Sequence, residues 1–148
     1  MKAHYLGHVV FYVKDLEQSL DFYRDRLGFR EVGRAFQGRA VALTSGRTHH
    51  ELLLIEVGDV PGPPQGARRG LYHIGIKIGD NLDELRSAKE DLEKAGVPLS
   101  GMSDHTVTQS LYLHDPDGNE VELYIDVPGI NWDQNPELVL SPIKALML

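Results

Sequence analysis

The sequence has 148 residues, 41% of them hydrophobic and 25% charged, which is long enough to bury a substantial core and typical of a globular protein. Its formal net charge of −7 argues against a nucleic-acid partner and an anionic membrane surface, and no apolar run approaches the roughly 18 residues of a bilayer span. Lys14 and Asp15 interrupt the N-terminal apolar stretch too early for a signal peptide, and the absence of cysteine leaves a metal only nitrogen and oxygen ligands, so we expect a cytoplasmic protein.

The first half of the chain predicts a strand, a helix and three more strands. Aromatic and β-branched residues alternate in residues 8–15, which is typical of a strand. Asp15, with Gln18 three positions later, favours a helix N-terminus, and Gly28 favours its C-terminal end. Further strands are expected within residues 29–36, 39–46 and 50–57, followed by a linker rich in proline and glycine at residues 58–70.

The same order of elements returns in the second half. Residues 71–79 alternate as a strand does, and Asn81 with Glu84 gives the capping-box pattern of a helix that ends at Gly96. A less regular strand is expected between residues 97 and 107. Two regular strands are expected over residues 108–115 and 119–126, and the four residues that join them suit a type I turn, being Asp115, Pro116, Asp117 and Gly118.

The matching order of elements in the two halves predicts an α+β protein built from two βαβββ modules. Residues 40–57 lie over residues 110–127 without a gap, and His8 lies over His73 at the start of each module. Pairing of the modules would join their sheets into an open, barrel-like cup. The alternative is a pair of unrelated α+β halves.

Three side chains of this repeat are candidate metal ligands. Side chains alternate along a strand with a period of two, so those on one face would point into the cup. His8 and His73 hold equivalent positions, and Glu122 shares a face of the last strand with Glu120 and Tyr124. Two imidazoles and one carboxylate suit a divalent non-haem metal with positions open for substrate and oxygen. Taken singly, each histidine has the alternative of a hydrogen-bonded or exposed strand residue, and Glu122 that of an exposed edge residue.

The segments "LGHVVFYVKDLEQSLDFYRDRLGF", "LYHIGIKI" and "SLYLHDPDGNEVELY" resemble the vicinal oxygen chelate superfamily over about residues 5 to 127. That superfamily includes glyoxalase I, fosfomycin-resistance and bleomycin-resistance proteins, methylmalonyl-CoA epimerase and extradiol catechol dioxygenases. The resemblance implies one vicinal oxygen chelate domain over residues 1–148. Its parts would be module one at about 5–57, the linker at 58–70, module two at about 71–127 and a C-terminal tail at 128–148. It also implies that His8, His73 and Glu122 are the metal ligands.

Members of this superfamily differ in how many protein side chains bind the metal. Enzymes like glyoxalase I use four protein ligands, with an acidic residue on the last strand of each module. The gapless overlay places Leu52 opposite Glu122, and Leu52 cannot bind a metal. Glu51 is one residue away, on the opposite face, and Glu56 lies about 13 Å further along an extended strand. Three ligands are therefore expected, as in extradiol dioxygenases and fosfomycin-resistance enzymes. The basic residues that the fosfomycin enzymes place after the glutamate are missing here.

The resemblance to extradiol dioxygenases also implies catalytic residues. Those enzymes have a histidine at the strand start that matches "HHELLLIEV", a tyrosine ten residues before the glutamate ligand and a histidine upstream of that tyrosine. Here these are His50, Tyr112 and His105. His50 shares a strand face with Leu52 and would point into the cup as an acid or base, while His49 would point the other way. The alternatives are a strand-initiating residue for His50 and a core aromatic residue for Tyr112.

We therefore expect an Fe(II)-dependent extradiol dioxygenase, with Mn(II) possible, that acts on a small aromatic diol and O2 as a homodimer. A glyoxalase-type isomerase or an epimerase on the same scaffold is the first alternative, and Glu51 or Glu56 in the metal shell would favour it. A metal-free binding protein of the bleomycin-resistance kind is the second. Whether the C-terminal segment covers the cup, with Trp132 lining it, stays open at this point.

Overall fold

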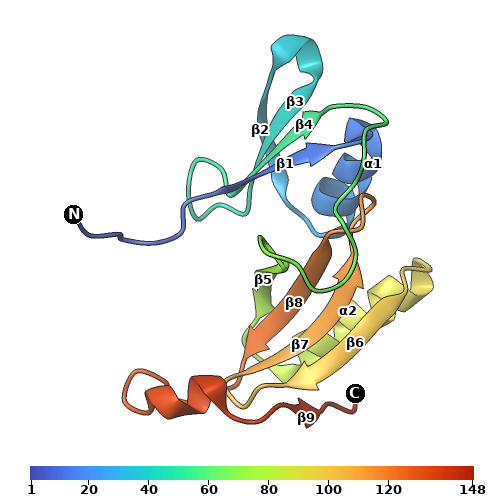
Figure 1. Ribbon diagram of the computed structural model, residues 1–148. Helices are drawn as coiled ribbons and strands as arrows, with labels where there is room; N and C mark the ends of the chain where they lie inside the picture. Colours follow the sequence, from blue (N-terminus) through green and yellow to red (C-terminus); the bar gives the residue numbers. More distant parts are fainter. The chain divides into compact units, whose positions relative to one another are not determined.

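The computed structural model describes residues 1–148, which form two compact units (Figure 1). Unit 1 comprises Met1–Gln65 together with the turn Asp115–Gly118, and unit 2 comprises Gly66–His114 and Asn119–Leu148. Each unit holds one sheet. None of the helices combines the length and the apolar character that a bilayer-spanning segment needs.

Unit 1 contains a four-stranded sheet in the order β1-β4-β3-β2. β1 and β4 are parallel, and β3 runs antiparallel to both of its neighbours. All four strands fall within the segments expected from the sequence: β1 (Val9–Val13), β2 (Arg30–Ala35), β3 (Ala40–Thr44) and β4 (Leu52–Glu56). A short 3-10 helix, η2 (Phe36–Gly38), joins β2 to β3.

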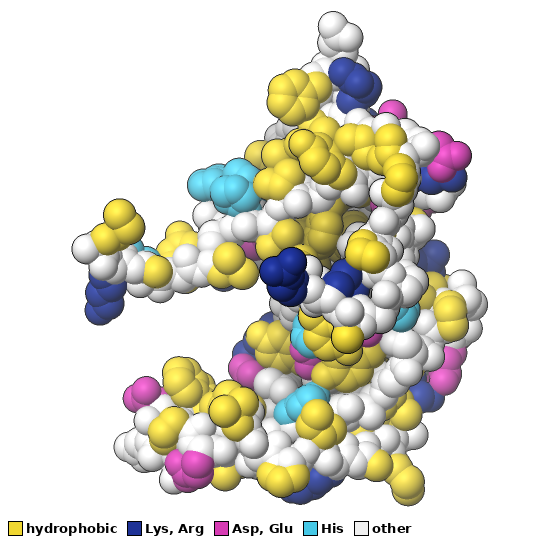
Figure 2. Space-filling view, viewed as in Figure 1, with side chains coloured by type: hydrophobic (Ala, Val, Ile, Leu, Met, Phe, Trp, Pro, Cys, Tyr) yellow, Lys and Arg dark blue, Asp and Glu magenta, His cyan; other side chains and the backbone are white.

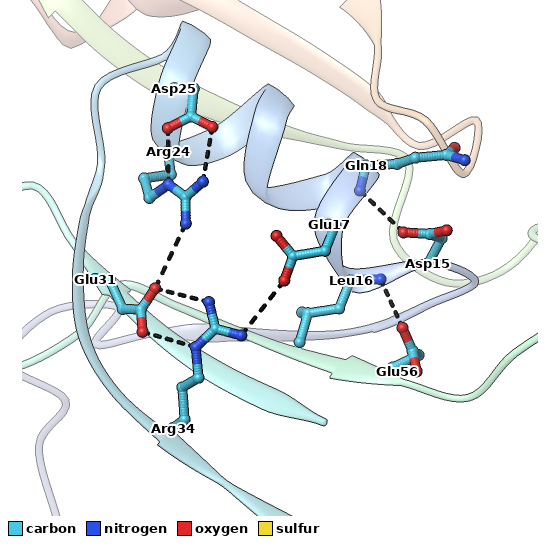
Figure 3. Close-up of polar contacts among 9 residues, drawn as sticks. All are labelled: Asp15, Leu16, Glu17, Gln18, Arg24, Asp25, Glu31, Arg34 and Glu56. Carbon is cyan, nitrogen blue, oxygen red and sulfur yellow. Dashed lines mark hydrogen bonds and ion pairs between the residues drawn. The ribbon is translucent and has the colours of Figure 1, made fainter. Parts of the chain in front are cut away.

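The helix of unit 1 starts where Asp15 was expected to cap it. α1 (Leu16–Leu20) continues into the π-helical segment η1 (Asp21–Arg26). The Gln18 amide donates to Asp15 Oδ1 at 3.0 Å, and the Leu16 amide donates to Glu56 Oε2 at 2.9 Å (Figure 3). Because Glu56 belongs to β4, this second bond attaches the start of the helix to the last strand of the module.

Exposed ion pairs surround the same helix. Glu31 Oε1 accepts from Arg34 Nε at 2.8 Å, and Glu31 Oε2 lies 3.6 Å from Arg24, which is paired in turn with Asp25 (Figure 3). Solvent screens such pairs, so each contributes at most about 1 kcal/mol to stability. The module is stabilised mainly by its apolar core.

Unit 2 repeats the arrangement of unit 1 and adds one strand. Its sheet order is β5-β8-β7-β6-β9, with β5 and β8 parallel and the other pairs antiparallel. Both units therefore have the expected βαβββ order, which confirms the internal repeat. The two-residue β9 was not expected. The elements are β5 (His73–Gly79), α2 (Leu82–Lys94), β6 (Leu99–Asp104), β7 (Thr108–His114), β8 (Glu120–Asp126), η3 (Pro136–Leu140) and β9 (Lys144–Ala145).

Two of the local signals read from the sequence of this half are confirmed. The Asn81 side chain accepts from the Glu84 amide, and the Glu84 side chain accepts from the Asn81 amide, so both halves of the capping box form. In the turn between β7 and β8 the Gly118 amide donates to the Asp115 carbonyl at 3.0 Å, as a type I turn requires.

β8 has two faces of different character. Val121, Leu123 and Ile125 are buried, and α2 packs against β5, β7 and β8. Glu122 and Tyr124 are only partly buried on the opposite face, together with Glu120 at the strand start. The alternation expected from the sequence is confirmed, and it places the carboxylates of β8 away from the helix.

The gapless overlay of the two modules is wrong by one residue at β4. Val41 pairs with Leu54 in unit 1, whereas the matching Leu111 pairs with Leu123 in unit 2. The connection from β3 to β4 is one residue longer than that from β7 to β8, so the residue equivalent to Glu122 is Leu53 instead of Leu52. Leu52 is 4% exposed and lies on the buried face with Leu54. A one-residue slip exchanges the two faces of a strand.

A buried hydrogen bond fixes the turn between β7 and β8 within unit 1. The hydroxyl of Tyr23 donates to Asp115 Oδ2 at 2.7 Å, and both side chains are buried. Burial, with the nearby Asp115 carboxylate, raises the pKa of Tyr23 well above its usual range. The amide of Lys14 donates to Asp117 Oδ1 at 2.9 Å in the same turn. The DPDG motif is therefore a structural contact of unit 1.

We expect Tyr23→Phe to lower the free energy of unfolding by about 1–3 kcal/mol, because it removes a hydrogen bond to a buried carboxylate. Urea unfolding followed by circular dichroism measures this. Tyr12→Phe is the matched control, since Tyr12 is 73% exposed; its change should stay within about 0.5 kcal/mol. Equal effects of the two substitutions would contradict the role given to the buried bond.

Candidate functional site

Two of the three expected metal ligands are neighbours in unit 2. His73 starts β5 and Glu122 lies in β8, and the parallel pairing of these strands places His73 Nε2 3.2 Å from Glu122 Oε2. Both side chains are partly exposed, at 28% and 15%. Gly75 pairs with Glu122 in this ladder, and a Cβ at that position would lie 3.4 Å from the Tyr124 ring and 3.6 Å from Glu122 Oε2. The glycine thus keeps the space beside the carboxylate open.

The other oxygen of Glu122 is the centre of a hydrogen-bond network. Ser110 Oγ donates to Glu122 Oε1 at 2.6 Å, and the Tyr112 hydroxyl donates to the same atom at 3.0 Å. His105 Nε2 lies 2.7 Å from the Tyr112 oxygen. Burial, and then the charge of Glu122, raises the pKa of Tyr112 to about 12, so its hydroxyl keeps its proton at neutral pH. The expected residues His105, Tyr112, Glu122 and His73 form one connected chain of contacts.

The second nitrogen of His73 faces another carboxylate. His73 Nδ1 is buried and lies 3.4 Å from Glu120 Oε1, yet it makes no hydrogen bond, because the approach is poorly directed. An imidazole nitrogen with a carboxylate on its far side is the usual environment of a metal-binding histidine, since the carboxylate fixes the tautomer and the ring orientation.

His73 and Glu122 fit a divalent metal by their chemistry. With metal–ligand bonds of about 2.1 Å, two ligands on adjacent positions of one ion lie about 3 Å apart, close to the separation of these two atoms. An imidazole nitrogen and a carboxylate oxygen suit iron, manganese or zinc. No group of three or more histidine, aspartate or glutamate side chains is arranged to hold a metal.

The third expected ligand, His8, lies in unit 1 beside His50. The centroids of the two imidazole rings are 4.5 Å apart. His49 joins them, with its Nδ1 2.6 Å from His50 Nδ1, so one ring donates and the other accepts. Figure 2 shows these histidine side chains gathered at one edge of unit 1. Burial, followed by the nearby His49 and His8, lowers the pKa of His50.

The expectation that His49 and His50 point to opposite sides is wrong. Their ring centroids are 4.5 Å apart. Alternation applies only within a strand, and β4 begins at Leu52, two residues after His50. The face on which Leu52 lies therefore does not determine where the His50 ring points. Leu52 itself lies on the buried face of β4. Its position beside His8 is the observation that relates it to the expected site.

Both carboxylates considered as a fourth ligand have structural partners. Glu51 accepts from the Ser45 amide and from Ser45 Oγ, each at 2.9 Å, and it lies 3.6 Å from Arg47. Glu51 corresponds to Glu120 in the observed register, so it lies on the face of Leu53, not on the opposite face as the overlay suggested. Glu56 accepts a hydrogen bond from the Leu16 amide at the start of α1. Neither carboxylate has both oxygens free for a metal.

A cavity of about 510 Å³ lies within unit 2, on the Glu122 face of β8. Its floor is formed by Glu122, Tyr124 and Asp126. Trp132, in the C-terminal segment, also lines it. The volume is in the range of small-molecule sites. Trp132 lining a cavity over the sheet was a possibility that the sequence left open.

The model of the Glyoxalase/Bleomycin resistance protein/Dioxygenase superfamily matches residues 5–123. The chain belongs to this superfamily. The match spans both βαβββ modules, so the two modules are those of the vicinal oxygen chelate fold. The resemblance inferred from the sequence motifs is confirmed.

Relatives in the superfamily include proteins named as dioxygenases and as a lyase. The chain is 34% identical over 133 residues to catechol-2,3-dioxygenase of Bacillus subtilis, covering 90% of this chain and 45% of that protein. It is 29% identical to an iron-dependent extradiol dioxygenase of Rhodococcus jostii, covering 79% and 41%. Among solved structures, a lactoylglutathione lyase of Agrobacterium tumefaciens is 26% identical with a TM-score of 0.63, covering 84% and 96%. The chain spans less than half the length of these two dioxygenases.

The sequence did not reveal two contacts of the site, and it left a third feature, the cavity wall from the C-terminal segment, undecided. Ser110 holds Glu122, and it lies two residues before Tyr112 on the same face of β7, so the period of two could have identified it. Glu120 was assigned to the right face, but its contact with His73 depends on the parallel register of β5 and β8. The cavity wall from the C-terminal segment has no strand periodicity that could have signalled it.

We expect Glu122→Gln to lower the affinity of the protein for Mn(II) by more than about 100-fold, since loss of a supporting neighbour alone costs 10- to 100-fold. Electron paramagnetic resonance of free Mn(II) measures the binding. Glu51→Gln and Glu56→Gln are the controls and should retain one ion per chain. Loss of the ion in either control would contradict a three-ligand site.

Proposed function

We propose that the protein is an extradiol, ring-cleaving dioxygenase that acts on a small aromatic diol and O2 with Fe(II), or alternatively Mn(II), as its metal. One observation carries the proposal: Glu122 contacts both the His73 imidazole and the Tyr112 hydroxyl at the floor of a cavity of about 510 Å³. Relatives named as dioxygenases support it.

His8, His73 and Glu122 would hold the metal. Two histidines and one carboxylate occupy three coordination positions and leave others for substrate. A bound Fe(II) would bring the two diol oxygens and dioxygen together and pass electron density between them. The engagement of Glu51 and Glu56 by other partners supports three protein ligands over four.

Tyr112 and His105 are proposed to position the substrate and to move a proton. The Tyr112 hydroxyl keeps its proton at neutral pH, so it can donate to a substrate oxygen that lies beside Glu122. His105, 2.7 Å from the Tyr112 oxygen, can supply or accept the proton that such an exchange requires.

His50 is proposed as the acid and base. A substrate bound at His8 would lie within reach of His50, because the two rings are 4.5 Å apart. An imidazole can take a proton from a diol hydroxyl and return it to the product. His49, hydrogen-bonded to His50, would hold the ring and define which nitrogen carries the proton.

The proposed ligand set combines residues of both units. His8 belongs to unit 1, whereas His73 and Glu122 belong to unit 2, so the set is complete only when a unit 1 and a unit 2 are paired. We propose one vicinal oxygen chelate domain over residues 1–148 that functions as a homodimer. The pairing can occur within a chain or between two copies.

A glyoxalase-type isomerase is the second candidate. The likeness to a lactoylglutathione lyase favours it, because that structure is covered over 96% of its length. An isomerase would act without consuming O2, which separates it from the first candidate.

We expect the protein, reconstituted with Fe(II) under anaerobic conditions, to consume one O2 for each diol when it is mixed with catechol, 3-methylcatechol or 2,3-dihydroxybiphenyl. An oxygen electrode and the visible absorbance of the ring-opened product measure this. Lack of oxygen uptake across a broad panel of catechols by a metal-loaded protein would rule out the dioxygenase.

We expect His50→Ala to lower turnover by about 100- to 10,000-fold at unchanged metal content, because it removes a proton-transfer group. Plasma emission spectrometry and steady-state oxygen uptake measure the two quantities. His114→Ala is the control, since His114 is exposed at the end of β7. Loss of metal from His50→Ala would make His50 a ligand and contradict its role as a base.

A further inference from the structure

The C-terminal segment returns to the outer edge of the sheet of unit 2. It leaves β8 at Asp126, and β9 pairs with the outer edge of β6, Ser103 with Ala145. Since β7 lies between β8 and β6 in the sheet, the segment passes along the ends of these strands to reach this edge (Figure 1). Leu146, just after β9, is 9% exposed. The segment is thus fixed at both ends.

Three apolar side chains of residues 128–148 line the cavity on the Glu122 face: Ile130, Trp132 and Val139, named here the tail wall. Trp132 is 59% exposed and Val139 45% exposed. Large apolar side chains that are open to solvent at a cavity of this size offer an apolar surface to a ligand. Figure 2 shows hydrophobic side chains exposed along the C-terminal segment.

The charges at the cavity are acidic. Glu122 and Asp126 line it, and no lysine or arginine does so. Lys77 is bound to Asp126 at 2.6 Å and also contacts Asp80, so its charge is already matched. A ligand with its own carboxylate would find no lysine or arginine in the lining, and it would be repelled by Asp126, which shares the single charge of Lys77 with Asp80.

We propose that the tail wall determines substrate choice, and that the substrate is an aromatic diol with a neutral, apolar alkyl or aryl substituent that packs against Trp132 and Val139. The diol part of this assignment rests on the proposed function. The preference for a neutral over an anionic substituent rests on the cavity lining alone.

The test compares two ligands with the same diol and substituents of similar size, 4-ethylcatechol and 3,4-dihydroxyphenylacetate. Anaerobic titration calorimetry gives the affinities, with and without Fe(II). Trp132 is the single tryptophan of the chain, so its emission reports binding at the tail wall directly. N-acetyltryptophanamide corrects the emission for absorption by the ligands.

We expect 4-ethylcatechol to bind at least about tenfold more tightly than 3,4-dihydroxyphenylacetate and to change the Trp132 emission. Val139→Lys should lower the ratio of the affinity for 4-ethylcatechol to that for 3,4-dihydroxyphenylacetate by about tenfold, or reverse the preference, because it adds a cation to the tail wall. Leu140→Lys is the matched control: Leu140 is adjacent, 90% exposed and not part of the lining, so the ratio should stay as in the unaltered protein.

Equal or tighter binding of the carboxylate by the unaltered protein would overturn the proposal. So would binding without a change in Trp132 emission, or equal shifts of the ratio in Val139→Lys and Leu140→Lys. The ratio is measured without turnover. The expected affinity ratio without oxygen uptake would therefore refute the dioxygenase and leave the substrate preference of the tail wall standing. Oxygen uptake without the expected ratio would refute the role of the tail wall and leave the dioxygenase standing.

Discussion

The alternation of side chains along β8 is the constraint on which the arrangement of unit 2 depends. Val121, Leu123 and Ile125 are buried, and this directs Glu122 and Tyr124 to the other face. One set of apolar contacts thus both stabilises the module and presents the Glu122 carboxylate on the other face. A change of register by a single residue would bury the carboxylate and expose the apolar residues.

The neighbours of β8 then determine what the carboxylate can do. The parallel strand β5 brings His73 to one oxygen of Glu122, and the antiparallel strand β7 brings Tyr112 to the other. An imidazole and a phenol thus meet at one carboxylate. Because the same face of β8 forms the floor of a cavity, the groups proposed to bind the metal and the substrate lie on one surface. This is why the proposed chemistry and the proposed substrate class are both assigned to this face.

Most of the fold and part of the site could be predicted from the sequence. Strands, helix caps and the βαβββ repeat have local signals, such as the box formed by Asn81 and Glu84, and His73, Glu122, Tyr112 and His105 were brought together as expected. The match of Leu52 to Glu122 was wrong, because an overlay without gaps cannot account for the one additional residue between β3 and β4. The expectation that His49 and His50 point to opposite sides was wrong, because strand alternation does not extend into the connection before β4. The tail wall could not be predicted, since its residues follow no period.

The central claim is that His8, His73 and Glu122 bind one metal ion and no fourth carboxylate does. A crystal structure of the protein soaked with Mn(II), with the ion located by its anomalous scattering, tests this most directly. We expect one ion per site, bound by two histidines and Glu122. An ion that also binds Glu51 or Glu56, or an ion located away from Glu122, would contradict it.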